Sequence, residues 1–261
     1  MIIAQITDTH LSDADTADPV FDARAENLRE CIADINSLDP KPDAVIHTGD
    51  MTQHGQAAEF LHARTLLGEL EAPLYVTPGN RDGRDGMSRA FAIDGYMRAD
   101  CTFVHYAVDR HPVRLVTVDS LADDGDNKGD FCQARLAALD TTLNDKPERP
   151  TALFMHHPPF DVPVAPDPFA YQRRKAVTNL VSVISQHPQV VRIFTGHMHR
   201  PWTAKVGGVA ASTVPSIATD LRKGDYPPPM DGQPVYQVHR FEDDWGFASE
   251  TRLTASGSGS R

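Results

Sequence analysis

The sequence predicts an α/β fold in which helices cover a buried sheet. Short apolar runs alternate with longer segments whose apolar residues recur at helical spacing, and this alternation is typical of layered strands and helices. The chain has 261 residues, of which 40% are hydrophobic, so it is long enough to bury one large core. We therefore expect a single domain over residues 1–255 and a flexible tail at 256–261.

In the first part of the chain, strands and helices alternate regularly. Short apolar runs predict strands at 2–7, 44–48 and 74–77. Helical spacing of apolar residues predicts helices at 22–38 and 56–70. Two prolines, Pro40 and Pro42, end the first helix, because proline has no backbone N–H to donate within a helix.

In the second part the alternation continues and then stops at Gly196. Strands are predicted at 102–108, 114–118, 152–155 and 190–194, and helices at 131–143 and 173–185. Beyond Gly196 we expect strands that close one edge of the sheet, at 203–211, 235–241 and 246–253. Two proline-rich loops, 157–168 and 226–234, are long enough to be walls or lids of a site.

The charge balance limits the classes of partner. Lys and Arg total 25 against 36 Asp and Glu, which gives a formal net charge of −11. An acidic surface argues against nonspecific binding to nucleic acid or to an anionic membrane. A substrate that carries phosphate must then be attracted by a local positive feature, such as bound cations. The sequence shows neither a membrane-spanning run nor a signal peptide, and its three unpaired cysteines suit a reduced cytoplasmic protein.

Five predicted strands end in residues that can bind metal. Because ligands gather at the carboxyl ends of strands in α/β sheets, these side chains can converge although they are distant in sequence. They are Asp8, His10, Asp50, Asn80, His156, His197 and His199. Each motif alone could be an ordinary turn, since Gly, Asn and Asp favour such positions. Together, and in this order, they predict a metal centre.

The ligand types and their number indicate what this centre holds. Imidazole nitrogen mixed with carboxylate and amide oxygen suits iron, manganese, cobalt or zinc better than calcium or magnesium. Seven ligands are too many for one catalytic ion with an open position. Two divalent or mixed-valence transition metal ions that share one carboxylate would use all seven.

This set of motifs resembles the calcineurin-like metallophosphoesterase family. The matching motifs are Asp8-x-His10, Gly49-Asp50, Gly79-Asn80-Arg81-Asp82, His156 and Gly196-His197-x-His199. The text around His156 is most similar to the branch with bacterial glycerophosphodiesterases and class III cyclic nucleotide phosphodiesterases. The resemblance covers about residues 1–220. It implies a four-layer α/β/β/α sandwich with two central mixed sheets.

The resemblance also implies a role for each ligand. One ion would be held by Asp8, His10, His199 and a bridging Asp50. The other would be held by the same Asp50 with Asn80, His156 and His197. Hydroxide produced at the metals would attack phosphorus, so Asp50 and Asn80 are predicted to be catalytic, and Asn80 is also expected to orient the substrate.

Arg81 departs from the family pattern, which usually has histidine after the asparagine. That histidine is commonly proposed to protonate the leaving group, whereas arginine keeps its proton. We predict that Arg81 is catalytic and binds a pair of phosphate oxygens. The alternative is a surface arginine paired with Asp82 or Asp85. Gly-Asn-Arg-Asp also occurs in the branch that cleaves a UDP-linked lipid precursor, but the apolar helical cap of that branch is not found in this sequence.

A second departure and a further histidine complete the predicted site. Where the glycerophosphodiesterase branch has a late histidine, the stretch 212–219 supplies only hydroxyl groups. Leaving-group protonation would then fall to water or matter less, which favours good leaving groups. His157 follows the ligand His156 directly and is predicted to lie behind the ligands or to bind the substrate.

The predicted function is hydrolysis of small phosphodiesters of the glycerophosphodiester or cyclic nucleotide class. Alternatives on the same site are a phosphomonoesterase and a nucleotide pyrophosphatase. A noncatalytic interaction module without metals is a third reading, although all seven ligand positions are filled. No nucleic-acid partner is expected, because no basic stripe with stacking aromatic residues is apparent. The family resemblance allows a homo-oligomer.

Overall fold

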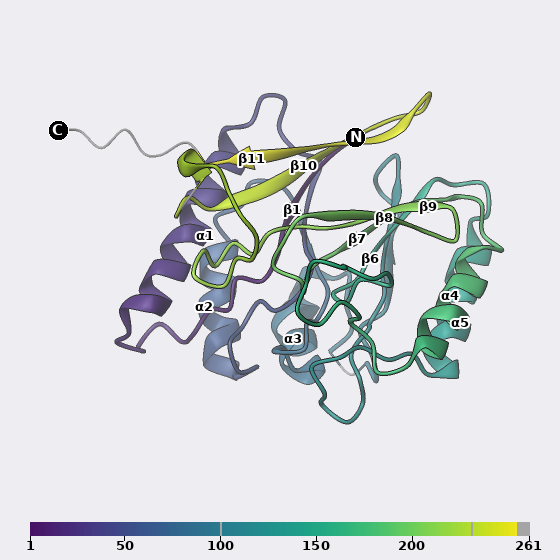
Figure 1. The fold of residues 1–261 in the computed structure, drawn as a ribbon, viewed down its shortest axis with the longest axis horizontal. Helices are drawn as coiled ribbons and strands as arrows, with labels where there is room; N and C mark the ends of the chain where they lie inside the picture. The colour runs from purple at the N-terminus through teal and green to yellow at the C-terminus, as the bar shows by residue number, and fades with distance from the viewer. Residues whose placement is uncertain (100, 231, 255–261) are drawn as a thin grey trace.

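Two β-sheets form the centre of the molecule, and helices cover their outer faces (Figure 1). The computed structural model describes residues 1–99, 101–230 and 232–254, so the expected tail at 256–261 lies outside the described residues. Helices α1, α2 and α3 lie on the side of the first sheet, and α4 and α5 lie on the side of the second (Figure 1). This arrangement confirms the α/β class with two central mixed sheets.

The first sheet has the strand order β11-β10-β1-β2-β3. Its parallel part comprises β1 (Ile2–Ile6), β2 (Ala44–His47) and β3 (Leu74–Val76). The hairpin of β10 (Val235–Glu242) and β11 (Gly246–Leu253) adds antiparallel to β1. The three parallel strands are almost entirely buried, as expected where a sheet is covered on both faces.

The second sheet has the order β4-β5-β6-β7-β9-β8. Its parallel strands are β5 (Arg114–Thr117), β6 (Thr151–Phe154), β7 (Val190–Thr195) and β9 (Val209–Thr213). The antiparallel strands β4 (Tyr106–Val108) and β8 (Trp202–Val206) form its two edges. The carboxyl ends of the parallel strands of both sheets meet in one region, where the backbone hydrogen bonds Asp8 N to Gly49 O and Gly196 N to His156 O link neighbouring strand ends.

The helices match their predicted positions, with one exception. They are α1 (Pro19–Ser37), α2 (Ala57–Leu67), α3 (Arg84–Phe91), α4 (Gln133–Asp145) and α5 (Arg174–Ile184), with 3₁₀ turns at Ala92–Asp94 and Pro228–Met230. Asp18 caps α1 by accepting a hydrogen bond from Val20 N, and proline occupies the first helical position. No helix in the described ranges is long and apolar enough to cross a membrane.

The structure differs from the predicted elements in three places. Helix α3 was not predicted, because it is one short helix of eight residues in which only Met87 and Phe91 mark the buried apolar face. The predicted strand 203–211 is a hairpin of β8 and β9, since Gly207 and Gly208 take φ values of 57° and 90° that suit a tight turn. The predicted strand 102–108 is regular only from Tyr106.

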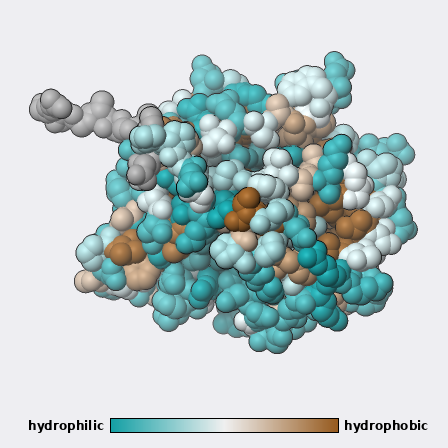
Figure 2. Space-filling view, in the orientation of Figure 1, coloured by the Kyte–Doolittle hydropathy of each residue, from teal (hydrophilic) through white to brown (hydrophobic). Residues whose placement is uncertain are grey.

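The expectation that the last strands close one edge is also wrong. The hairpin β8–β9 extends the second sheet, whereas β10–β11 extends the first. Apolar residues of both sheets, among them Ile3, Phe154 and Phe194, belong to one buried cluster. Packing between the sheets therefore fixes their strand ends relative to each other. The outer face shown in Figure 2 is mostly hydrophilic, with apolar side chains in scattered groups.

Leu28→Ala and Leu61→Ala form a matched test of this core. Leu28 of α1 is 0% exposed, whereas Leu61 of α2 is 70% exposed. We expect Leu28→Ala to lower the free energy of unfolding by about 2–5 kcal/mol, because it leaves a cavity in the core. Leu61→Ala should change it by no more than about 0.5 kcal/mol. Urea denaturation followed by circular dichroism measures both, and equal losses would contradict the assignment of α1 to the core.

Candidate metal centre

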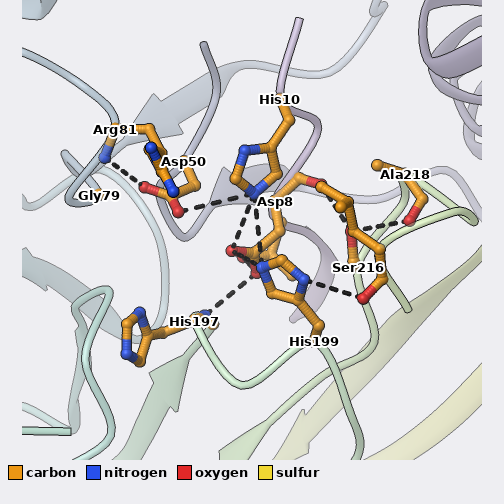
Figure 3. Close-up of polar contacts among 12 residues, drawn as sticks. Asp8, His10, Asp50, Gly79, Arg81, His197, His199, Ser216 and Ala218 are labelled. Atoms are coloured by element: carbon orange, nitrogen blue, oxygen red, sulfur yellow. Dashed lines mark hydrogen bonds and ion pairs between the residues drawn. The ribbon is translucent and has the colours of Figure 1, made fainter. Parts of the chain in front are cut away.

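The structure brings together all the side chains that the sequence marked as metal ligands. Each lies in a loop that directly follows a parallel strand of one of the two sheets. The loops after β1, β2 and β3 come from the first sheet, and those after β6 and β7 come from the second. Figure 3 shows the side chains of Asp8, His10, Asp50 and His199 facing one another, and the backbone N of His197 donating to Asp8.

The first group of donor atoms comprises Asp8, His10, Asp50 and His199. Their candidate ligand atoms all lie within 4.8 Å of one another. His199 Nε2 is 3.2 Å from Asp8 Oδ1 and 3.4 Å from His10 Nε2, and His10 Nε2 is 3.6 Å from Asp50 Oδ2. Two carboxylates and two imidazoles therefore converge on one small volume that could hold a metal ion.

The second group adjoins the first through Asp50. Asn80 Oδ1 lies 3.1 Å from His156 Nε2 and 3.0 Å from His197 Nδ1. Asp50 Oδ1 is 3.5 Å from His156 Nε2, while its Oδ2 faces His10. One carboxylate oxygen of Asp50 thus faces each group of donor atoms.

His157 packs behind the second group rather than within it. Its ring nitrogens could ligate a cation together with His156 and His197 on distance alone. However, His157 Nδ1 lies 2.9 Å from Ser120 Oγ and Nε2 lies 3.0 Å from Asn127 O, so both nitrogens have hydrogen-bond partners. The Asn80 oxygen therefore fits the second group better than His157 does. The His157 ring is buried, and its centroid lies 4.5 Å from that of the His197 ring. A contact between His157 and the substrate stays a prediction.

Backbone strain is concentrated at five of the predicted ligands. Asp8, His10, Asp50, His197 and His199 have φ values of 53°, 46°, 50°, 69° and 53°. They are all the non-glycine residues with positive φ in the described ranges. Such conformations cost about 1–3 kcal/mol each and persist where the surrounding structure enforces them, most often at functional sites. The positions of these ligands are therefore held against local backbone preference.

Two glycines of the motifs are required by close backbone approach. A Cβ at Gly79 would lie 2.1 Å from Asp50 N, and one at Gly196 would lie 2.1 Å from Thr7 Oγ1. Both separations are too short for any side chain. The glycines that precede Asn80 and His197 thus allow the ligand loops to pack against each other.

Hydrogen bonds orient two of the histidines that are predicted to be ligands. His156 Nδ1 donates to Thr48 O at 2.8 Å, and His199 Nδ1 donates to Leu221 O at 3.1 Å. These bonds leave the Nε2 atoms directed into the centre, as in metal-binding histidines. Asp8 Oδ1 is buried and accepts no hydrogen bond from the described residues. A cation at this position would satisfy that carboxylate oxygen, so the donor set fits a metal ion.

The electrostatics are those of a site prepared for cations. Burial would raise the pKa of Asp8, but His199 beside it lowers the pKa to about 2. Burial lowers the pKa of His10 to about 4 and that of His197 to about 3, so both rings are neutral at pH 7. Burial opposes protonation of His156 as well, yet Asp50 raises its pKa to about 9. A metal ion would have to displace this proton from His156.

Arg81 lies beside the centre with a free guanidinium. Its backbone N donates to Asp50 Oδ1 at 2.7 Å, as Figure 3 shows, and its side chain is exposed. Its guanidinium makes no hydrogen bond or ion pair with the rest of the described chain. The alternative of pairing with Asp82 or Asp85 is wrong. Asp82 is buried and instead accepts hydrogen bonds from the backbone of the ligand loops, from Met51 N, Thr52 N and Gly79 N.

The hydroxyl groups of the stretch 212–219 are used in the structure of the loops. Ser216 Oγ donates to Asp8 O at 2.7 Å, and Thr213 Oγ1 donates to Gly196 O at 2.8 Å (Figure 3 shows the first). Sequence reasoning missed one contact of a ligand. Asn80 Nδ2 lies 3.4 Å from Asn127 Oδ1, and Asn127 belongs to an exposed acidic loop without a recognisable motif.

Comparison with known proteins agrees with this geometry. The family model described as calcineurin-like phosphoesterase matches residues 1–201. A probable glycerophosphodiester phosphodiesterase of Arcobacter nitrofigilis is 30% identical over 257 residues, which are 96% of this chain and 92% of that protein. A 3',5'-cyclic adenosine monophosphate phosphodiesterase of Pseudomonas aeruginosa is 26% identical over 248 residues, which are 94% of this chain and 86% of that protein.

A solved structure shows the same fold. A dimetal phosphatase from Danio rerio superposes with a TM-score of 0.67 at 15% identity, over 98% of this chain and 99% of its own. The family model spans more than half of the chain and covers every ligand in the two donor groups. The chain therefore belongs to the calcineurin-like phosphoesterase family.

Proposed function

We propose that this protein is a hydrolase that uses two metal ions to cleave small phosphodiesters of the glycerophosphodiester or cyclic nucleotide class. The observation that carries the proposal is the position of Asp50, whose two carboxylate oxygens face two separate groups of donor atoms. One shared carboxylate between two groups is the arrangement of a dinuclear site. The relatives named as glycerophosphodiester and cyclic nucleotide phosphodiesterases support the substrate class.

The ligands divide naturally between two ions. Asp8, His10 and His199 would hold one ion, and Asn80, His156 and His197 would hold the other, with Asp50 shared. Iron, manganese, zinc and cobalt are the proposed ions, because the donor set combines imidazole nitrogen with carboxylate and amide oxygen. When bound, the ions supply a water that loses its proton near neutral pH and positive charge that offsets the charge of the phosphate.

The residues of the chain itself bind and orient the substrate. Asn80 and Arg81 are neighbours in the chain and the Arg81 side chain is exposed, so both can hold phosphate oxygens at the rim of the centre. Arginine cannot release its proton, and the hydroxyls of Ser216 and Thr213 are engaged by backbone carbonyls. We therefore propose that substrates with good leaving groups are favoured. A cytoplasmic location, the absence of nucleic-acid and membrane partners, and a homo-oligomer remain predictions of the sequence and the resemblance.

Hydrolysis of bis(p-nitrophenyl) phosphate and p-nitrophenyl phosphate tests the proposal. The chelated protein is reconstituted separately with manganese, iron, cobalt and zinc, and metal-dependent preference for the diester is expected. Asp50→Ala should lose bound metal, and its kcat should fall at least about 10³-fold. Removing even one transition-state contact lowers kcat about 10²- to 10³-fold. Asp85→Ala is the matched control, since the Asp85 side chain is exposed and its carboxylate lies 4.0 Å from Arg89.

The alternatives predict other outcomes of the same assay. Preference for the monoester would indicate a phosphatase, and cleavage of nucleotide pyrophosphates with no diester activity would indicate a pyrophosphatase. Inactivity with every metal, together with unchanged metal content in Asp50→Ala, would favour the noncatalytic module.

Arg81→Ala tests the proposed phosphate contact. A charge-assisted hydrogen bond contributes about 1.5–3 kcal/mol, so we expect kcat/KM for the diester to fall about 10- to 100-fold. Metal content should not change, because only the backbone N of Arg81 bonds to the ligand Asp50. Unchanged kcat/KM would show that the guanidinium does not touch the substrate. A loss of metal would instead assign Arg81 a structural role.

The pH dependence of metal binding tests the role of His156. Its pKa is raised to about 9, so without metal the ring is protonated at pH 7 and must lose the proton to ligate. Binding to the site of Asn80, His156 and His197 should therefore tighten about tenfold for each pH unit between 7 and 9, and release at least about one proton. Calorimetry in two buffers of different ionisation enthalpy measures this release. An affinity independent of pH over that interval would contradict the protonated state.

A further inference from the structure

We propose that two arginine–aspartate pairs position the ligands of the two metal ions separately. The Arg24 clamp consists of Arg24 and Asp220 and braces the site of Asp8, His10 and His199. The Arg84 clamp consists of Arg84 and Asp119 and braces the site of Asn80, His156 and His197. This inference rests on the proposed dinuclear function, and it makes the four clamp residues positioning residues that contact no substrate.

The Arg24 clamp joins helix α1 to the loop after β9. Arg24 Nε and Nη2 donate to Asp220 Oδ1 and Oδ2 at 3.1 and 2.7 Å, a bidentate pair. Arg24 Nη1 donates to the backbone O of His10 at 3.2 Å and to Gln53 Oε1 at 2.9 Å. The Arg24 side chain is only 7% exposed, so its guanidinium is held in this position by these partners.

The same clamp reaches His199 through the chain neighbour of Asp220. Leu221 O accepts the hydrogen bond from His199 Nδ1 that directs His199 Nε2 into the centre. One guanidinium therefore fixes the backbone of one histidine ligand and the loop that orients another. Both ligands belong to the first donor group, so loss of the clamp should affect that group.

The Arg84 clamp joins the start of helix α3 to the loop after β5. Arg84 Nε and Nη2 donate to Asp119 Oδ2 and Oδ1 at 2.7 and 3.2 Å. Arg84 also donates to Leu121 O at 2.8 Å and lies 3.0 Å from Asp123. The Asp119 side chain is fully buried. Arg84 is four residues after Asn80 in the chain, so the clamp holds the segment that carries Asn80.

The loop after Asp119 reaches the second donor group directly at Asn80 and indirectly through His157. Ser120 Oγ lies 2.9 Å from His157 Nδ1, and the His157 ring packs against His197. Asn127 Oδ1 lies 3.4 Å from Asn80 Nδ2 and thereby leaves Asn80 Oδ1 facing the histidines. The clamp thus ties the loop that carries Asn80 to the loop that supports it.

The clamps are needed because each donor group takes ligands from both sheets. Loops from the first sheet supply some ligands and loops from the second supply others, and lateral movement between them would separate the ligands. A bidentate arginine–carboxylate pair restricts both distance and orientation, which a lysine cannot do. The two clamps share no residue, so their effects should be separable.

Cobalt binding to the chelated protein tests the inference. The variants are Arg24→Gln and Arg84→Gln, each combined with Asn80→Ala, which disables the second site, or with His199→Ala, which disables the first. Visible absorption of Co²⁺ and calorimetry report affinity and coordination at the remaining site. Arg84→Gln should weaken binding about 10- to 100-fold in the His199→Ala background and leave the Asn80→Ala background unchanged. Arg24→Gln should do the reverse.

Control variants separate positioning from stability. Arg64→Gln removes a comparable bidentate pair with Asp94, at 2.7 and 3.2 Å, that no donor group contacts, and it should leave both sites unchanged. Arg24→Lys and Arg84→Lys keep the charge without the fork and should recover part of the affinity. If either Gln variant fails to fold, the Lys variants carry the same comparison.

The possible outcomes are distinct. Equal weakening of both sites by each clamp variant, or no weakening in folded variants, would overturn the inference. Binding of fewer than two Co²⁺ ions by the unmodified chain would instead contradict the dinuclear site itself. A selective change in the Co²⁺ spectrum of one site supports the clamp, because a loss of stability alone would not distinguish the two sites.

Discussion

The buried carboxylate of Asp50 is the interaction on which the rest of the site depends. Its two oxygens face two groups of donor atoms, and His156 beside it holds its pKa well below the usual range although burial acts in the opposite direction. A buried anion of this kind requires nearby positive charge. Without a metal ion the protonated ring of His156 supplies part of that charge, and bound metal ions can replace it.

Placing this carboxylate imposes constraints on the backbone around it. Asp50 itself has a φ of 50°, and four other ligands share this left-handed conformation. Gly79 must lack a side chain because a Cβ there would lie 2.1 Å from Asp50 N. The buried Asp82 holds the same loops together by accepting hydrogen bonds from Met51 N and Gly79 N. The hydrogen bonds and packing of the fold thus offset the cost of strained ligand loops.

The acidic character of the chain and the chemistry of the site are consistent with each other. A formal charge of −11 repels phosphate at long range, so attraction must come from the centre and its rim. Arg81 supplies an exposed guanidinium at that rim, where the family pattern usually has histidine. Arginine at this position can bind a negatively charged group, but it cannot give up a proton as histidine can. Substrate preference in this protein should therefore depend on the leaving group.

The sequence by itself determined the α/β class, the main strands and the seven residues predicted to be ligands, because periodic apolar patterns and short motifs are local signals. It did not reveal α3 or the β8–β9 hairpin, whose signals are one short apolar stripe and a Gly207–Gly208 turn. Only the tertiary structure decided that Asp82 supports the loops, that His157 packs behind the ligands, and that the clamps cross between the sheets. Arg24 and Asp220 are 196 residues apart, and such contacts leave no periodic trace in a sequence.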